Sequence, residues 1–142
     1  FALNCPYELK DGYAYISLQG NAAVELTLDM PLTVMAANRE VHASAGRVAV
    51  LRGPVVYCAE GVDNGENLHA YSVPCDFGYK EEFSAEFGLP AIEVNATRLI
   101  PFDSGLYSSR RPEKVAATLK MIPYNCFANR GKTDMIVWLH AE

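Results

Sequence analysis

The sequence predicts an all-β protein, an antiparallel, jelly-roll-like β-sandwich with little or no helix. Two observations carry this prediction. Apolar and polar residues alternate with a period of two in several segments, whereas the 3.6-residue period of a helix is nearly absent. Turn residues also separate these segments at short intervals, which is typical of an antiparallel sandwich rather than of alternating strands and helices.

The N-terminal part of the chain supplies three strand-like segments, residues 13–18, 24–28 and 33–37. In the second of them, apolar residues alternate with polar ones, which predicts a half-buried strand with one face in water. Turn signals at 11–12 and 20–21 separate the first two segments from their neighbours.

A buried hairpin is expected in the middle of the chain. The runs 48–51 and 55–59 are apolar throughout, as in strands that are covered on both faces. Arg52 and Gly53 lie between them with Pro54. Because proline cannot donate a hydrogen bond to a strand ladder, Pro54 fits the turn or the start of the second strand.

Two further strands are predicted by alternation, at 92–97 and 115–122. The segment 79–87 is where a short helix is expected, because Phe83 and Phe87 are four residues apart and would meet on one helix face. An Asn-x-Thr sequon begins at residue 95, but it lies inside a predicted strand and carries no weight.

The C-terminal part combines a loop with a last strand. Residues 102–113 form the longest segment without a hydrophobic pattern, and we expect an exposed loop there, where function often resides. This loop contains Arg110 and Arg111. The apolar run 135–139 includes the single tryptophan, Trp138, and predicts a buried or interface strand.

Composition excludes several functional classes. The 142 residues are 50% hydrophobic and 20% charged, which suits one compact domain, or one domain plus part of another. The net charge of -5 argues against nucleic-acid binding, since phosphate contacts need clustered lysines and arginines. No apolar run is long enough to cross a membrane, and residues 1–10 do not resemble a signal peptide.

The cysteines and histidines show no metal-ligand spacing. No Cys-x-x-Cys pair occurs, and we favour free thiols, although two disulfides could form in three ways. Burial in its apolar run would raise the pKa of Cys58 and make it inert, and no base accompanies Cys126. The residues in question are Cys5, Cys58, Cys75, Cys126, His42, His69 and His140.

The candidate carboxylates for acid–base chemistry are Glu60, Asp63 and Glu66, which follow the buried run 55–59. We favour a solvated acidic turn, because no second acidic group pairs with them at a recognisable spacing. No catalytic, cofactor-binding or metal-binding residue is therefore assigned, and ligand-binding residues stay unknown.

Aromatic residues allow two interpretations. The chain has eight Tyr, six Phe and one Trp. We expect most of them to fill a sandwich core, as aromatic residues in strands usually do. The alternative is a carbohydrate-binding module, in which exposed aromatic rings stack on sugars.

Several motifs together resemble one family. The run from Arg52 to Cys58 and the closing run from Ile122 to Trp138 are the most specific, and segments 12–16 and 24–31 occur in the same order. This arrangement resembles the C-terminal part of glycoside hydrolase family 127, whose characterised activity is β-L-arabinofuranosidase. Residues 18–21 depart from the family's usual Trp and Gly-Asp turn, which would change the surface there.

The resemblance implies that catalysis lies elsewhere. That family places it in an N-terminal (α/α)6 barrel, where a zinc-bound cysteine acts as the nucleophile beside a Cys-Cys pair. This sequence has no such pair. We therefore expect zinc in the barrel of a larger bacterial parent enzyme, none in this chain, and no activity of the chain alone. Its expected partners are that barrel and, in a homodimer, a second copy.

The resemblance also suggests how the chain is divided. Residues 1–142 would be C-terminal sandwich material, with 41–130 inserted as a second sandwich between 1–40 and 131–142. Three functions stay open: an accessory domain that supports the barrel, a carbohydrate-binding module, and a structural oligomerisation domain. Because the chain opens on Phe1, we expect a fragment, and its compartment, bacterial cytoplasm or periplasm, is not determined.

Overall fold

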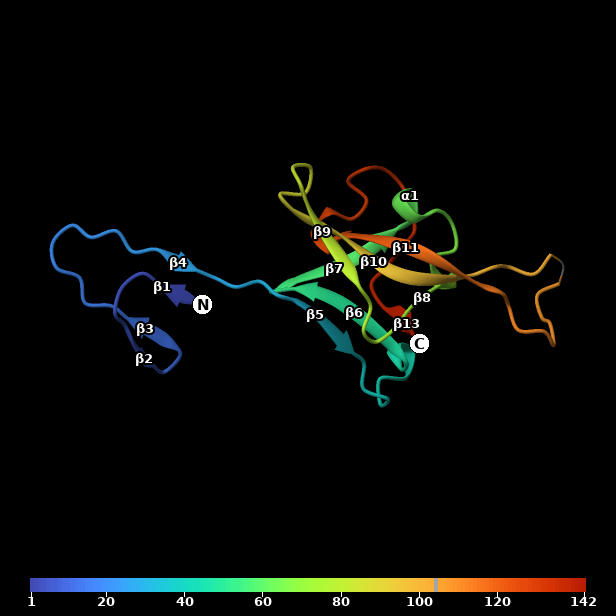
Figure 1. Cartoon of the computed structure of the whole chain (residues 1–142), viewed down its shortest axis with the longest axis horizontal. Helices are drawn as coiled ribbons and strands as arrows, with labels where there is room; N and C mark the ends of the chain where they lie inside the picture. Colours follow the sequence, from blue (N-terminus) through green and yellow to red (C-terminus); the bar gives the residue numbers. More distant parts are fainter. Residues whose placement is uncertain (104) are drawn as a thin grey trace. The chain divides into compact units, whose positions relative to one another are not determined.

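The computed structural model describes residues 1–103 and 105–142, which form two compact units (Figure 1). Unit 1 is Phe1–Pro31, and unit 2 is Leu32–Glu142. Ser104, which belongs to the expected loop 102–113, lies outside the described residues.

Unit 1 contains two small antiparallel sheets, in which β1 pairs with β4 and β2 pairs with β3. Its strands are β1 (Ala2–Leu3), β2 (Glu8–Lys10), β3 (Tyr13–Tyr15) and β4 (Leu26–Thr27). Asp11 and Gly12 both have positive φ angles, as a tight hairpin turn requires. None of the residues in this unit is buried. The predicted strands at 13–18 and 24–28 are therefore present, but they are short and uncovered.

Unit 2 contains one nine-stranded sheet. Its strands are β5 (Leu32–Ala36), β6 (Arg47–Arg52), β7 (Val55–Glu60), β8 (Tyr71–Val73), β9 (Tyr79–Ser84), β10 (Leu89–Leu99), β11 (Lys114–Pro123), β12 (Met135–Ile136) and β13 (Leu139–Ala141). Its helical turns are α1 (Gly61–Asn64), η1 (His42–Ser44), η2 (Leu68–Ala70) and η3 (Tyr124–Cys126). The prediction of an all-β, mainly antiparallel fold with little helix is confirmed.

Six strands of unit 2 close into a ring. Hydrogen bonds join β6 to β7, β7 to β11, β11 to β10, β10 to β8, β8 to β13, and β13 back to β6. The pairing of β8 with β13 is parallel. Along one edge, β7 pairs first with β6 and then with β12, while β10 pairs first with β9 and then with β8. Such changes of partner turn the corners of a sandwich, and the ring surrounds the main apolar cluster of unit 2.

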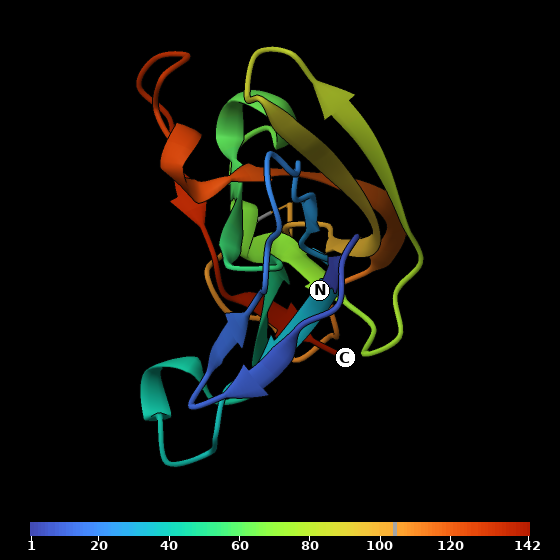
Figure 2. The ribbon, with the colours of Figure 1, turned by 90° about the vertical axis from the view of Figure 1, so that its left-hand side faces the viewer.

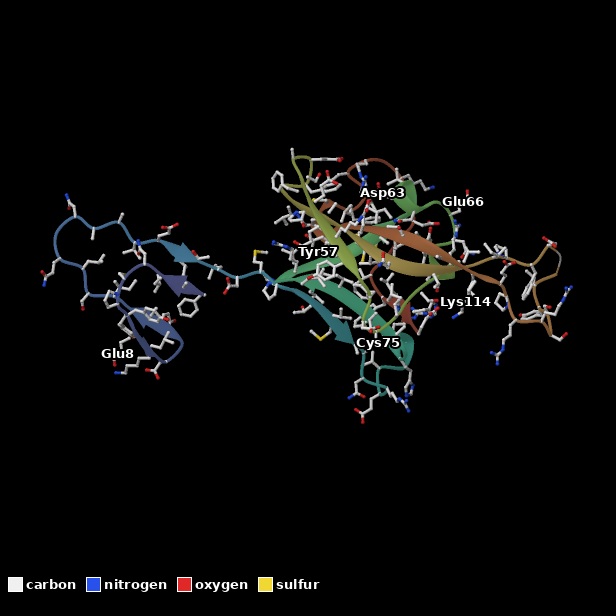
Figure 3. All side chains as sticks on the ribbon, viewed as in Figure 1. Glu8, Tyr57, Asp63, Glu66, Cys75 and Lys114 are labelled. Carbon is white, nitrogen blue, oxygen red and sulfur yellow. The ribbon has the colours of Figure 1, made fainter. Side chains whose placement is uncertain are left out.

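The core of unit 2 lies inside this ring. Ile92 faces Met121 and Val94 faces Leu119 across β10 and β11, and all four side chains are fully buried. Each such side chain contributes about 1.5–3 kcal/mol when it leaves water. Tyr57, which is labelled in Figure 3, is also fully buried, and its hydroxyl donates a hydrogen bond to the carbonyl oxygen of Pro90 at 2.8 Å.

Several sequence predictions are confirmed strand by strand. The hairpin of 48–51 and 55–59 appears as β6 and β7, which pair directly across the Gly53-Pro54 turn. The segments 92–97 and 115–122 lie within β10 and β11, and segment 33–37 largely coincides with β5. The residues between β10 and β11 that the structure describes have no regular structure, as expected for a loop.

The predicted short helix at 79–87 is wrong. Residues 79–84 form β9, an edge strand that runs antiparallel to β10 and is drawn in olive in Figure 2. Gly88, at a φ of 66°, lies in the turn that joins the two strands. Hydrogen bonding to β10 outweighs the weak helical signal of Phe83 and Phe87, whose spacing alone favours a helix by only a few tenths of a kcal/mol.

The last apolar run also differs from expectation. Residues 135–139 do not form one strand: β12 ends at Ile136 and β13 begins at Leu139, with a bend at Val137 and Trp138. Trp138 is half-buried. Strands β12 and β13 pair with β7, β6 and β8, all in unit 2. The structure divides into two compact units after Pro31, and the insertion of residues 41–130 as a second sandwich stays a prediction.

Candidate functional site

The acidic residues after β7 form an ion-pair cluster with Arg130. Glu60 is the last residue of β7, Asp63 lies in the turn α1, and Arg130 lies in the turn that follows η3. The Arg130 guanidinium donates hydrogen bonds to both carboxylates, including one from Nη1 to Asp63 Oδ1 at 3.0 Å. Lys120 Nζ donates a further one to Asp63 Oδ1 at 3.0 Å.

The surroundings fix these groups in place. The Glu60 side chain is fully buried, and its Oε1 accepts the backbone N–H of Ala128 at 2.7 Å. Asn64 joins α1 to β11: its Oδ1 accepts the Lys120 N–H at 2.8 Å, and its Nδ2 donates to the Lys120 carbonyl oxygen at 2.9 Å. Two carboxylates thus face two cations, which neutralises the charge at the end of the sheet.

Burial and ion pairing set the protonation state of Asp63. Burial alone would raise the pKa of the Asp63 carboxyl, but hydrogen bonds from Arg130 and Lys120 outweigh it and hold that pKa below its usual value. The hydrogen bond to Asp63, and after it the one to Glu60, raise the pKa of Arg130 against the effect of burial. A carboxylate held ionised by two cations is a poor proton donor, so this cluster acts as a structural clamp.

This arrangement corrects the expectation of a solvated acidic turn. Glu60 is 1% exposed and Asp63 is only partly exposed, whereas Glu66 is exposed as expected. In Figure 3, Asp63 lies at α1, and Glu66 lies on the segment that follows this turn. No local pattern predicts Arg130 as the partner of Glu60, because 70 residues separate the two. The one signal in the sequence is Glu60 itself, because a charged residue that directly continues an apolar strand indicates a buried carboxylate that needs a partner.

Cysteine chemistry is disfavoured at the buried thiols. Burial, reinforced by the nearby charge of Glu60, raises the pKa of Cys58 to about 12. Cys58 and Cys126 lie in one small apolar cluster with Ile122. All four cysteines are free thiols in the structure, as favoured from the sequence, although Cys75 is exposed.

The resemblance places zinc in the catalytic barrel, and the described part of this chain offers no donor set that would fit it. Within residues 1–103 and 105–142, no three His, Cys, Asp or Glu side chains lie close enough together to hold a metal ion. The described part of the chain also has no helix that is long and apolar enough to span a membrane.

Two surface cavities in unit 2 combine charged and aromatic groups. One, of about 390 Å³, lies in the loop between β10 and β11 and includes Phe102, Asp103, Arg110 and Arg111. In the same loop, Leu106 and Tyr107 are more than 90% exposed. This loop projects away from the sheet in Figure 1. It contains the chain's basic cluster, as the sequence predicted.

The second cavity, of about 300 Å³, lies over the β9–β10 hairpin and includes Phe83 and Phe87. The sequence predicts that most aromatic residues fill the core. Tyr57, Tyr71 and Phe77 are indeed buried, but Phe83 is 69% exposed. The remaining strongly exposed aromatic residues are Phe1, Tyr7, Tyr13, Tyr15, Tyr79, Phe102, Tyr107 and Tyr124.

The sequence of this chain is similar to proteins of one known family. Residues 32–140 match the model of a family described as the glycoside hydrolase family 127 C-terminal domain. The chain is 32% identical over 141 residues to a non-reducing end β-L-arabinofuranosidase of Bifidobacterium longum, covering 92% of this chain and 21% of that protein.

Solved structures give the same picture. A family 127 β-L-arabinofuranosidase from Geobacillus stearothermophilus T6 superimposes with a TM-score of 0.83 at 35% identity, covering 94% of this chain and 22% of that one. A second family 127 β-arabinofuranosidase superimposes with a TM-score of 0.81 at 32% identity, covering 99% of this chain and 23% of that one. The chain thus spans about a fifth of the length of these relatives.

Proposed function

Because this chain belongs to glycoside hydrolase family 127, in which it matches the C-terminal domain, we propose that it is a non-catalytic accessory β-domain of a larger glycoside hydrolase. Its role is to cover part of the catalytic portion of the same polypeptide, and it takes no direct part in bond cleavage. The parent enzyme acts on β-L-arabinofuranosides, by analogy with the relatives described above.

The observation that carries this proposal is the exposed apolar surface of unit 1. Its 31 residues include nine large hydrophobic side chains that are exposed to solvent. Two-stranded sheets of this size are not stable in water without a covering partner, and monomeric proteins rarely leave so much apolar surface uncovered. The nine are Phe1, Tyr7, Leu9, Tyr13, Tyr15, Leu18, Val24, Leu26 and Leu28.

The partner that we propose is the remainder of the parent polypeptide, since the relatives are roughly five times longer than this chain. The ionisable groups of unit 2 also favour a structural role over a catalytic one. Its best-placed carboxylates, Glu60 and Asp63, are held by Arg130, and its Cys58 thiol is buried with a high pKa. The reacting groups, and the zinc expected with them, then belong to the catalytic portion.

The first test is an activity assay on the purified 142-residue chain with an aryl β-L-arabinofuranoside. We expect no hydrolysis above the buffer rate and less than stoichiometric zinc by elemental analysis. Robust turnover by the chain, abolished by a substitution within it, would overturn the proposal.

A second test addresses the covering of unit 1. The chain alone should bind an apolar fluorescent dye through this unit, and the Leu9→Ser/Tyr13→Ser variant should bind less of it. The full-length parent should bind little dye per molecule, because the same residues are then covered. Equal dye binding by the parent and the chain would contradict the accessory role. Dye binding that vanishes on self-association, measured by sedimentation, would favour the oligomerisation domain instead.

A further inference from the structure

The turn α1, which Asp63 marks in Figure 3, ends at the chain's single Asn-Gly pair, Asn64-Gly65. The pairing of β7 with β11 stops one residue before Glu60 and Lys120 would face each other. There Asn64 Nδ2 donates to the carbonyl oxygens of both residues, each at 2.9 Å, and Asn64 Oδ1 accepts the Lys120 N–H at 2.8 Å. The carboxamide of Asn64 thus bridges the two strands with both its donor hydrogens and its acceptor.

An Asn-Gly pair can modify itself without an enzyme. The backbone nitrogen of Gly65 loses its proton to base and attacks Asn64 Cγ, the bond from Cγ to Nδ2 breaks, and Nδ2 leaves as ammonia. Water then opens the resulting succinimide ring at one of its two carbonyl carbons, which leaves aspartate or isoaspartate at position 64. Glycine favours the attack, because it has no side chain to hinder its nitrogen and its backbone is unusually free to adapt.

The fold holds both reacting groups away from this reaction. The Gly65 N–H donates to the Gly61 carbonyl oxygen at 2.7 Å. The backbone carbonyl oxygen of Asn64 accepts the hydroxyl of the buried Tyr71 at 3.0 Å, and its side chain is fixed on β11. Cγ can therefore reach the Gly65 nitrogen only after the side chain leaves β11 and α1 opens. Local opening of this kind is rare in a native structure, and its population limits the rate of the reaction.

We propose that Asn64-Gly65 is a site of spontaneous deamidation, which the folded turn suppresses and which opening of α1 permits. The modification makes the opening irreversible. A carboxylate has no hydrogen to donate, so the product would set its negative charge against the carbonyl oxygens of Glu60 and Lys120, next to the carboxylate of Asp63. This site goes beyond the accessory role and does not depend on it, because the reaction needs only this turn and water.

The test is peptide mapping by mass spectrometry of the 142-residue chain during incubation in mildly alkaline buffer. A synthetic peptide of residues 60–68 gives the unprotected rate in the same buffer. We expect Asn64 to deamidate at least about tenfold more slowly in the folded chain than in the peptide. In the chain unfolded by urea, Asn64 should react faster than any other asparagine, Asn21 included, because it alone precedes glycine. Equal rates in the folded chain and the peptide would overturn the proposal.

Two substitutions ask whether the ion-pair clamp keeps α1 closed. Arg130→Met removes the cation that binds Asp63 in this turn, so it should raise the rate at Asn64 in the native chain at least about tenfold. Lys114→Met, in the exposed pair with Glu142, is the matched control and should change the rate less than about twofold. Equal rates in the two variants would refute the role of the clamp. The comparison with the peptide uses neither variant, so it stands even where Arg130→Met unfolds the chain.

The irreversible step has a test of its own. Asn64→Asp installs one product directly and should lower the urea midpoint of unit 2, measured by circular dichroism. Asn38→Asp is its control, because Asn38 lies in an exposed turn where its Oδ1 accepts the Glu40 N–H, a contact that a carboxylate retains. An unchanged midpoint for Asn64→Asp would contradict the claim that deamidation prevents reclosure. Hydrolysis assays on the unmodified chain report separately on the accessory role.

Discussion

Units 1 and 2 share the same kind of sequence pattern but differ in what covers it. In β10 and β11, alternate apolar residues such as Val94 and Leu119 are fully buried. In and around β4, Val24, Leu26 and Leu28 alternate with polar residues in the same way, yet they are 39%, 53% and 65% exposed. The difference lies in long-range pairing, because the ring of unit 2 closes around its apolar face. Alternation thus specifies which face is apolar, and the remaining strands decide whether that face is buried.

The clamp of unit 2 gives the largest expected effect. Arg130→Met should lower the free energy of unfolding of unit 2 by about 3–5 kcal/mol, because Glu60 is then left as a buried charge without its cation. Chemical denaturation monitored by circular dichroism measures this loss. Glu60→Leu combined with Arg130→Met should be less damaging than Arg130→Met alone.

The exposed ion pair of Lys114 with Glu142 is the control for that substitution (Figure 3). Lys114→Met should leave the denaturation midpoint nearly unchanged, since solvent screens exposed pairs. A loss as large as that of Arg130→Met would mean that charge removal in general, and not the buried clamp, determines the stability.

Core packing gives the next largest effect and contrasts the two units directly. Leu119→Ala should cost about 2–5 kcal/mol, because it leaves a cavity among fully buried side chains. Leu9→Ala in unit 1 should change the unfolding free energy of the chain by less than about 0.5 kcal/mol, since its side chain is exposed. Thermal unfolding of both variants checks the contrast, which similar losses would contradict.

Hydrogen exchange should separate the units without any substitution. Amides of β7, β10 and β11 should exchange at least about a thousandfold more slowly than those of β2 and β3, because opening the ring requires global unfolding. Deleting residues 1–31 should leave the slow amides of unit 2 slow. Fast exchange throughout unit 2 after the deletion would show that its core depends on unit 1.

Acid should act on the clamp with a smaller effect. The pKa of Asp63 is lower in the folded chain, so its ion pairs stabilise the fold above the unfolded Asp pKa of about 3.9. This stabilisation falls as the pH drops below that value and is lost below the folded pKa. Asp63→Asn should flatten the melting temperature between about pH 4 and pH 2 relative to the unmodified chain. An unchanged slope would exclude Asp63 as the titrating group.

The sequence predicted the local elements better than their partners. The β6–β7 hairpin followed from two apolar runs flanking Pro54, because that signal is contained in a dozen residues. The short strand β8 and the break at Val137 and Trp138 were missed. Strand β8 pairs with β13, and β12, just before the break, pairs with β7. In both cases the two partners are distant in sequence.

The same limit applies to the candidate sites. The sequence indicates Glu60 as a candidate carboxylate, but its partner Arg130 is apparent only from the fold. The cavity at β9 was hidden because Phe83 and Phe87 suggested a helix, whereas edge pairing with β10 made a strand. Local periodicity cannot report an edge strand's partner, since that information resides in the other strand.

The ring of unit 2 has a consequence for the order of events during synthesis. Strand β13 joins β6 to β8, yet it lies about 90 residues beyond β6 in the chain. A ribosome that has released β6 through β11 has therefore produced a sheet in which β6 and β8 both lack their partner β13, so other strands could add there. Closure must await the emergence of β13, so premature termination of translation before Leu139 would release a chain prone to aggregation.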